Sequence, residues 1–338
     1  MNKKALVTGG AGFIGSHLTD SLITRGLHVV VLDDLSGGFV ENLHEQAVFV
    51  QESVTDEKLV NRLFEEYRFD VVYHLGAYAA EGLSHFIKRF NYTNNLIGSA
   101  NLINACVNYD VKCYVFTSSI AVYGKNQLPM TEELVPMPED SYGIAKLAVE
   151  QELKSTHEMF GLNYVIFRPH NVYGERQNIG DRYRNVVGIF MNQIMHGEPM
   201  TIFGDGEQTR AFTYIGDVAP IIAEAPFNPL ALNKVFNIGA DIPYSVNELA
   251  QMVARAMGVE PKVRYLEARN EVVHAFSSHQ RVEEVFGYKA KVSFEAGLEA
   301  MARWARSVGP RRSKPFEGIE ILKNMPKSWL DELRQFSC

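Results

Sequence analysis

A tyrosine and a lysine stand four residues apart in the middle of the chain, at Tyr142 and Lys146. The pattern over residues 141–160 predicts a helix, which puts both side chains on one face, one turn apart. A lysine ammonium lowers the pKa of a nearby phenol from its usual value of about 10, so that the phenol can accept a proton near neutral pH. Ser119 can share hydrogen bonds with that phenol and with a substrate hydroxyl. Together these residues indicate redox chemistry at a carbinol carbon.

Such chemistry needs a hydride acceptor, and the start of the chain has the pattern of a dinucleotide site. Gly9, Gly12 and Gly15 follow an apolar run at residues 4–8 and precede a helical pattern at residues 17–25. Gly9 permits a tight turn, Gly12 lets a pyrophosphate approach the backbone, and Gly15 lets the helix pack closely on the strand. The N-terminus of the helix adds N–H donors and a positive dipole end.

The next strand-like run, residues 28–32, ends in Asp33 and Asp34. An acid at the end of this strand accepts hydrogen bonds from the adenosine ribose and repels a 2′-phosphate. Asp33 therefore favours NAD over NADP. A glycine-rich turn with an acidic cap would explain either signal alone, but not the strand, glycine run, helix, strand and acid in this order.

The composition is that of an ordinary globular enzyme. The chain has 338 residues, 46% of them hydrophobic and 22% charged, and a formal net charge of −7, which argues against general nucleic-acid affinity. Its three cysteines have no metal or redox spacing and are expected to be reduced, as in a cytoplasmic protein. The N-terminus runs into the first strand without a signal pattern, and no apolar stretch is long enough to span a bilayer, so no membrane association is expected.

Strand-like and helical runs alternate over the first half of the chain. This order predicts an α/β fold, a Rossmann-type doubly wound parallel sheet with a smaller C-terminal substrate-binding region. We expect residues 1–170 to bind NAD and residues 171–338 mainly to bind the substrate, with some elements returning to the first domain. The strands are expected at residues 5–8, 28–32, 48–51, 71–74, 113–117 and 165–168, and the helices at 56–67, 94–109, 141–160, 185–196, 245–257 and 292–307. No role is evident for residues 310–338, where Trp329 and Leu330 suggest packing onto the body and a loosely attached tail is the alternative.

As a set, several motifs resemble a known family over residues 3–305. The chain is similar to extended short-chain dehydrogenases/reductases of the nucleotide-sugar epimerase/dehydratase branch, most closely to UDP-hexose 4-epimerases. The motifs that carry the resemblance are residues 8–15, Asp33, residues 74–77, Asn95, residues 116–124, 142–146, 168–174 and 203–206, Arg210, and residues 217–218.

The resemblance implies C4 epimerisation of a UDP-sugar through a transient 4-keto sugar, with NAD retained. Tyr142 would be the base, Lys146 would lower its pKa and Ser119 would orient the hydroxyl. The 4,6-dehydratases of the branch usually have an Asp-Glu pair directly after the catalytic serine or threonine. Ile120 and Ala121 stand at those positions here and can transfer no proton, which argues against dehydration.

The resemblance also assigns binding residues. For the cofactor these are Gly9, Gly12, Phe13, Ile14, Gly15, Asp33, Asp34, Ser53, Val54, Leu75, Ala77, Asn95, Tyr142 and Lys146. For the substrate they are Ser119, Asn171, Phe203, Arg210, Arg269, Glu271 and Ala275. Ser53 departs from the aspartate that relatives usually place against adenine. The small Ala275 stands at a position whose size controls whether an N-acetyl group fits, which leaves room for UDP-GlcNAc as well as UDP-glucose.

Other readings stay open. Residues 176–184 are basic, so one of their arginines could bind a C6 carboxylate and make UDP-glucuronate the substrate, or Asp181 could be their counter-charge in a solvated loop. Another epimerase, dehydratase or decarboxylase activity, or a non-catalytic NAD-sensing protein, are further alternatives. His74 and His170 have no partners at metal spacing, so no metal is expected. The helices at 94–109 and 141–160 have apolar faces that pair across a two-fold axis in relatives, which suggests a homodimer.

Overall fold

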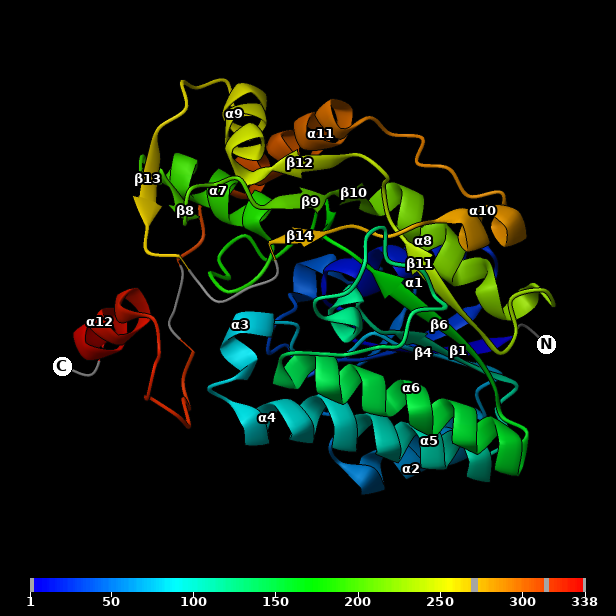
Figure 1. Ribbon diagram of the computed structural model, residues 1–338. Helices are drawn as coiled ribbons and strands as arrows, with labels where there is room; N and C mark the ends of the chain where they lie inside the picture. Colours follow the sequence, from blue (N-terminus) through cyan, green and yellow to red (C-terminus); the bar gives the residue numbers. More distant parts are fainter. Residues whose placement is uncertain (1–2, 269–272, 313–315, 337–338) are drawn as a thin grey trace.

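Seven parallel strands form the central sheet, in the order β11-β6-β5-β4-β1-β2-β3 (Figure 1). The structure, a computed structural model, describes residues 3–268, 273–312 and 316–336. The strands are β1 (Lys4–Thr8), β2 (His28–Leu32), β3 (Val48–Val50), β4 (Val71–His74), β5 (Cys113–Thr117), β6 (Asn163–Pro169) and β11 (Lys234–Ile238). The predicted Rossmann-type sheet is confirmed, and β11 is a strand that the sequence pattern did not indicate.

Helices cover both faces of this sheet because successive side chains on each strand point to opposite faces. Ala5 and Val7 face one way, against α1 (Phe13–Thr24) and α8 (Ile215–Glu224). Leu6 faces the other way. Its neighbours on that face come from α2 (Glu57–Tyr67), α5 (Gly98–Asn108) and α6 (Ser141–Phe160).

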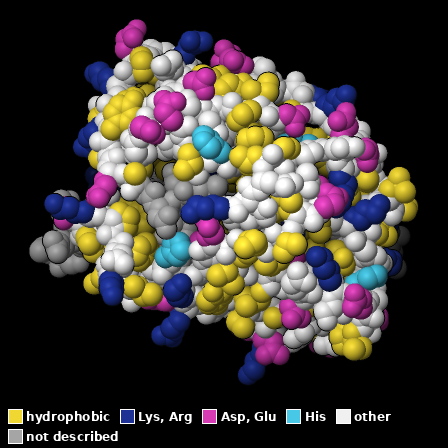
Figure 2. Space-filling view, viewed as in Figure 1, with side chains coloured by type: hydrophobic (Ala, Val, Ile, Leu, Met, Phe, Trp, Pro, Cys, Tyr) yellow, Lys and Arg dark blue, Asp and Glu magenta, His cyan; other side chains and the backbone are white. Residues whose placement is uncertain are grey.

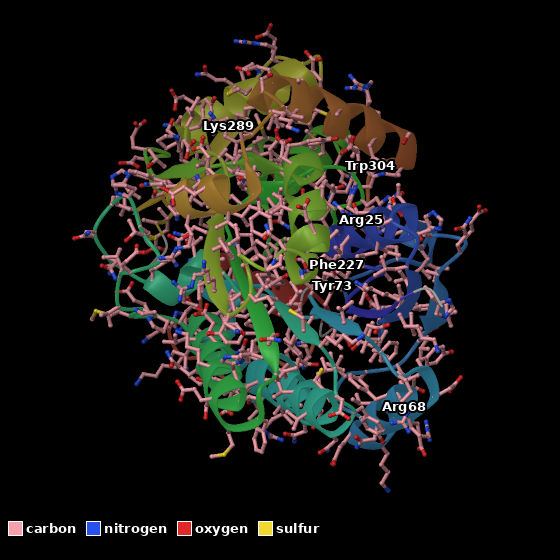
Figure 3. The ribbon with its side chains drawn as sticks, turned by 90° about the vertical axis from the view of Figure 1, so that its right-hand side faces the viewer. Arg25, Arg68, Tyr73, Phe227, Lys289 and Trp304 are labelled. Carbon is pink, nitrogen blue, oxygen red and sulfur yellow. The ribbon has the colours of Figure 1, made fainter. Side chains whose placement is uncertain are left out.

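Tyr73, which Figure 3 places in the interior, fixes the sheet to one of these layers. Its hydroxyl donates a 2.8 Å hydrogen bond to the carbonyl oxygen of Ala223 at the end of α8. Although α8 and β11 lie far beyond residue 170 in the chain, both therefore belong to the central layers.

The rest of the second half forms a region above the carboxyl edge of the sheet (Figure 1). Phe190, Leu249 and Met301 are fully buried in its core, which three helices share. The helices are α7 (Val186–Met195), α9 (Val246–Ala256) and α11 (Phe294–Val308), with α10 (Gln280–Phe286) packed against β11. Short strand pairs and a triplet complete the region: β7 (Val172–Tyr173) with β10 (Thr213–Tyr214), β8 (Met200–Phe203) with β13 (Val263–Leu266), and β9 (Thr209–Ala211) between β12 (Pro243–Ser245) and β14 (His274–Ala275).

The segment between β4 and α5 is broken into short pieces. It contains α3 (Glu81–Ser84), α4 (Lys88–Tyr92) and a π-helical turn at Thr93–Ile97. The helix expected at 94–109 therefore begins as a π-turn and becomes α-helical only at Gly98.

The chain ends in α12 (Lys327–Phe336), near α3 (Figure 1). Trp329 is buried there among Leu83, Ile87 and Met325, so this segment packs onto the body of the protein. Among the described residues, no helix combines the length and apolar character that a membrane span requires. On the face in Figure 2, basic and acidic side chains are mixed, without a large patch of one sign.

Candidate active site

A pocket of about 1280 Å³ opens at the carboxyl edge of the sheet. The register aligns the strand ends there, since Thr8 pairs with Leu32 and His74, and Thr117 pairs with Phe167. Ligands of open parallel sheets bind beyond this edge. Nearly all described residues of the expected sites line the pocket: Gly9, Gly12, Phe13, Ile14, Gly15, Asp33, Asp34, Ser53, Val54, Leu75, Ala77, Ser119, Tyr142, Lys146, Asn171, Phe203, Arg210 and Ala275.

The glycine run makes a turn with no room for side chains. Gly9 has φ +70°, a left-handed conformation that favours glycine. A Cβ on Gly15 would lie 2.1 Å from the carbonyl oxygen of Gly9, and one on Gly38 would lie 2.6 Å from the carbonyl carbon of Ala11. The turn therefore leaves bare backbone at the N-terminus of α1, as a pyrophosphate requires.

Asp33 sits directly beside this turn. Its two carboxylate oxygens accept hydrogen bonds from the backbone N–H groups of Ala11, at 3.0 Å, and Leu35, at 2.8 Å. Burial raises the pKa of this carboxyl, and the two backbone donors oppose that shift. Asp34 is exposed and accepts only from the N–H of Ser36 among the described hydrogen bonds. Glycine turn and buried acid together fit a dinucleotide with an unsubstituted adenosine ribose.

Asn95 is an expected cofactor residue that does not line the pocket. It is buried, and its amide exchanges hydrogen bonds with the backbone of Tyr78: the Tyr78 N–H donates to Oδ1 at 2.9 Å, and Nδ2 donates to the Tyr78 carbonyl at 3.2 Å. Asn95 therefore holds the backbone of the loop on which Leu75 and Ala77 line the pocket.

The helix α6 presents the expected catalytic pair. Asp140 caps its N-terminus by accepting from the N–H of Gly143 at 2.9 Å, which starts the helix one residue before Tyr142. Lys146 follows one turn later, as the spacing predicted. Its Nζ donates to the carbonyl oxygen of Thr117 at 2.8 Å and lies 5.8 Å from the centre of the Tyr142 ring.

Burial governs the charge of both groups. Burial lowers the pKa of Lys146 to about 7, although the nearby carboxylate of Glu150 favours the ammonium. Burial likewise raises the pKa of Tyr142, and the negative charge of Glu81 adds to that shift. The Ser119 side chain opposes it. The phenol is therefore protonated at neutral pH in the ligand-free protein, and a ligand must change its surroundings before it can act as a base.

Four of the expected substrate residues belong to the second half of the chain and line the pocket. Asn171 has φ +40° and donates from Nδ2 to the carbonyl oxygen of Ala211 at 3.2 Å. Phe203 ends β8, while Arg210 on β9 and Ala275 on β14 are register partners in the short sheet. Ala275 is buried, with its methyl group at the pocket wall. Arg269 and Glu271 lie outside the described residues.

Two arginines of the basic loop at 176–184 have acidic partners. Arg176 pairs with Asp20 of α1 at 2.8 Å, and Arg184 pairs with Asp181 at 2.5 Å. The proposed counter-charge role of Asp181 is therefore observed for Arg184. The guanidinium of Arg184 also lies 4.8 Å from the centre of the Tyr78 ring, and both residues line the pocket.

Sequence reasoning missed several pocket residues. Gln177 is 1% exposed and lines the pocket, and neither polar atom of its side chain finds a hydrogen-bond partner within the described part of the chain. A buried amide of this kind suits a bound polar ligand. Glu81 also lines the pocket, as do Arg312, Ser328 and Trp329 near the end of the chain. An aromatic residue near the end of the chain, Trp329, was the sign in the sequence that part of this segment is buried. The sequence does not show which residues the tryptophan contacts.

The two histidines considered for metal binding have other partners. His74 bonds Thr8 Oγ1 through Nδ1 at 2.7 Å and Ser99 Oγ through Nε2 at 2.8 Å. His170 bonds His279 between their Nε2 atoms at 2.9 Å. Residues 3–268, 273–312 and 316–336 contain no cluster of histidine, cysteine and acidic side chains arranged to hold a metal ion.

Comparisons with known proteins agree with this geometry. The model of the NAD-dependent epimerase/dehydratase family matches residues 5–239. A putative UDP-glucose 4-epimerase of Methanocaldococcus jannaschii is 34% identical over 308 residues, which cover 89% of this chain and 98% of the relative.

Solved structures give the same result. The UDP-glucose 4-epimerase of Thermotoga maritima, solved with UDP-glucose, superposes with a TM-score of 0.85 at 37% identity, covering 90% of this chain and 99% of the other. The UDP-glucuronic acid 4-epimerase of Bacillus cereus, solved with UDP-glucuronic acid and NAD, gives 0.82 at 30% identity with the same coverage.

The chain therefore belongs to the NAD-dependent epimerase/dehydratase family. The family resemblance deduced from the motifs is confirmed.

Proposed function

We propose that this protein is an NAD-dependent 4-epimerase of a UDP-sugar. The observation that carries the proposal is the convergence of Ser119, Tyr142 and Lys146 on the pocket that also holds the glycine turn. Ile120 and Ala121, directly after Ser119, offer no acid for dehydration. The similarity to UDP-glucose 4-epimerases over most of both chains supports the same activity.

We assign NAD to the first part of the pocket. Gly9, Gly12 and Gly15 would admit its pyrophosphate, and Asp33 would bind the adenosine ribose. Ser53 and Val54 also line the pocket, as do Leu75 and Ala77, which follow β4. When bound, NAD supplies the acceptor and donor of a hydride at the sugar C4.

The side chains of this protein perform the proton transfers. Tyr142 accepts the proton of the C4 hydroxyl, while Ser119 holds that hydroxyl in place. Lys146 stabilises the phenolate, and its Nζ is fixed by the carbonyl of Thr117. After the 4-keto sugar has turned its other face to the site, Tyr142 returns the proton and the epimer forms.

A sugar can turn in the site only if the nucleotide is held elsewhere. We assign that hold to Asn171, Phe203 and Arg210, together with Arg269 and Glu271. Residues 171–338 would thus bind mainly the substrate and residues 1–170 the cofactor, with α8 and β11 returning to the first domain.

UDP-glucuronate is the second candidate substrate. Arg182 of the basic loop lines the pocket, and the solved UDP-glucuronic acid 4-epimerase is similar over 90% of this chain. The acidic partners of Arg176 and Arg184 favour a neutral hexose, and the small Ala275 leaves room for UDP-GlcNAc as well.

Proton NMR tests the proposal. The purified protein is incubated with UDP-glucose, UDP-GlcNAc or UDP-glucuronate, first without and then with added NAD. The appearance of a C4 epimer in one tube supports the activity and identifies the sugar. No epimer in any tube, with NAD present, would refute UDP-sugar 4-epimerisation of these substrates.

We further propose a cytoplasmic homodimer. Cys106 and Cys113 are buried free thiols, as in a reducing compartment. Ile97 and Ile144, 53% and 44% exposed, lie at the π-turn before α5 and on α6, the helices expected to pair. Sedimentation of Ile144→Glu as a monomer, with the wild type as a dimer, would support this interface, whereas an unchanged mass would argue against it.

A further inference from the structure

The relative from Methanocaldococcus jannaschii and the structure from Thermotoga maritima each match almost over their full length, whereas this chain does not. The alignments cover 98–99% of those proteins but leave about a tenth of this chain unmatched. The stretch from residue 310 to the end makes up a similar share of the sequence. Many described residues of that stretch are exposed, but Phe316, Met325 and Trp329 pack onto the body of the protein, and their contacts suggest a function.

The segment is fixed first to the cofactor half of the molecule. The two carboxylate oxygens of Glu320 accept from the N–H groups of Arg89 and Phe90, at 2.8 and 2.9 Å, in the first turn of α4. The N–H of Glu320 donates to the carbonyl oxygen of Phe86 at 2.8 Å. The ring of Phe316 packs edge-on against that of Phe90, with centroids 4.9 Å apart.

The same segment also contacts the substrate half. The N–H of Phe316 donates to the hydroxyl of Tyr183 at 3.2 Å. The N–H of Arg311 donates to Oδ1 of Asn192 on α7, and Nδ2 of Asn192 donates back to the Arg311 carbonyl, both at 2.9 Å. The segment therefore bridges the two halves along one side of the pocket.

Trp329 is a residue of this segment that lines the pocket. Its ring is perpendicular to that of Tyr183, with centroids 5.1 Å apart. It also contacts α3, where a Cβ on Gly82 would lie 3.7 Å from the indole. Trp329, Tyr183 and Gly82 all line the pocket, and Trp329 is 6% exposed.

The helix α3 that Trp329 contacts is hydrogen-bonded to the helix that carries the proposed base. In α3, Ser84 accepts a 3.1 Å hydrogen bond from the N–H of Tyr142. Glu81, at the start of α3, and Arg184, next to Tyr183, line the same pocket as Tyr142. The indole thus lies between α3 and the loop that carries Tyr183, in the pocket that Tyr142 also lines.

We propose that Trp329 is a specificity-determining residue that packs against the C–H face of the sugar and favours an uncharged hexose. The inference rests on the proposed function. An indole offers an apolar surface and one N–H donor, so it cannot neutralise a sugar carboxylate. Glu81 lines the pocket beside it, and its negative charge disfavours a carboxylate there.

The first test measures binding and needs no change at Trp329. The chain has two tryptophans, and Trp304 lies on α11, outside the pocket lining (Figure 3). In Trp304→Phe, Trp329 is the sole tryptophan emitter. UDP-glucose should change its emission clearly more than UDP does, because only the sugar reaches the indole. Equal changes with UDP and UDP-glucose, or no change with either, would overturn the proposal.

The second test measures turnover. Trp329→Ala should raise the KM for UDP-glucose about tenfold, leave inhibition by UDP unchanged, and raise the preference for UDP-glucuronate over UDP-glucose. Trp329→Phe should restore most of the affinity, and Trp304→Phe is the matched control. If Trp329→Ala weakens UDP and UDP-glucose alike, the residue only stabilises the fold and the proposal is wrong.

The two tests separate this inference from the proposed function. If the emission of Trp329 responds to the sugar but no sugar is epimerised, the proposed activity is wrong and the proposed contact between Trp329 and the sugar is supported. If Trp329→Ala epimerises the sugar with the wild-type KM and the wild-type preference between UDP-glucose and UDP-glucuronate, the proposed role of Trp329 is wrong and the proposed activity is supported.

Discussion

Arg168 donates two hydrogen bonds to the carboxylate of Glu150 inside the protein, from Nε at 2.9 Å and from Nη2 at 2.5 Å. Glu150 is fully buried and Arg168 is 2% exposed. Glu150 lies one turn after Lys146 on α6, and its Oε1 also accepts a 2.6 Å hydrogen bond from Ser118, the neighbour of Ser119. The ion pair therefore joins α6, β6 and the serine segment, and neither of its residues lines the pocket, so we expect it to position the proposed catalytic residues.

Glu150→Gln should destabilise the protein and slow the reaction. The substitution leaves the Arg168 guanidinium buried without a counter-charge, which costs about 3–5 kcal/mol of the free energy of unfolding. Urea unfolding measures this loss, and Glu152→Gln, exposed on the same helix, is the control that should change stability by less than about 0.5 kcal/mol. Similar losses in both variants would show that the buried pair has no special role.

Tyr142→Phe should abolish most of the turnover while leaving binding intact. The ring keeps its packing, but the group that accepts the proton is gone, which costs about 10²–10⁴-fold in kcat. Initial epimerisation rates and the NAD content of the purified protein measure the two effects separately. Tyr109→Phe, at the end of α5 outside the pocket lining, is the control. Wild-type rates in Tyr142→Phe would remove the tyrosine from the mechanism.

The neighbouring acids Asp33 and Asp34 should differ in their effect on NAD. Asp33 is buried against the glycine turn, whereas Asp34 is exposed. Asp33→Asn removes a charged acceptor for the ribose hydroxyls, so we expect NAD affinity to fall at least about tenfold. Asp34→Asn should change it much less. Titration of the NAD-depleted protein gives both values, and the reverse order of the two variants would assign the ribose contact to Asp34.

Local patterns made much of this fold predictable. The apolar run of β1 and its glycine turn are contiguous in sequence, and the spacing of Tyr142 and Lys146 needs only a helix to bring them together. The rule that ligands bind beyond the carboxyl ends of parallel strands then located Ser119 and Asn171 at the pocket. These features depend on short stretches of chain, so the sequence alone displays them.

Features that depend on distant contacts were not predictable. Strand β11 is recognised only by its pairing with β6, and the π-turn at Thr93–Ile97 has no periodic pattern that marks it. Burial of the Gln177 amide follows from tertiary packing. For Trp329 the sequence left a packed and a loose tail equally open, because its partner Tyr183 comes from a remote loop.

Buried neutral histidines should make the protein sensitive to acid. Burial lowers the pKa of His74 from 6.5 to about 3, and the charge of Lys146 adds to the shift. Burial lowers the pKa of His170 to about 3 as well. Between pH 6.5 and about 3 the unfolded chain binds a proton at each histidine that the folded protein does not. The free energy of unfolding should therefore fall with falling pH in this window, by about 1.4 kcal/mol per pH unit for each histidine.

His74→Gln tests the contribution of one such group. A glutamine amide can still bond the hydroxyls of Thr8 and Ser99 but does not titrate, so the fall between pH 6.5 and 5.5 should become shallower by about 1 kcal/mol. Urea unfolding at pH 7.5, 6.5 and 5.5 gives the slopes. His28→Gln, at an exposed position on β2, should keep the wild-type slope. If the slope of His74→Gln equals that of the wild type, the pKa of His74 does not differ between the folded and the unfolded chain, and burial does not keep this histidine neutral.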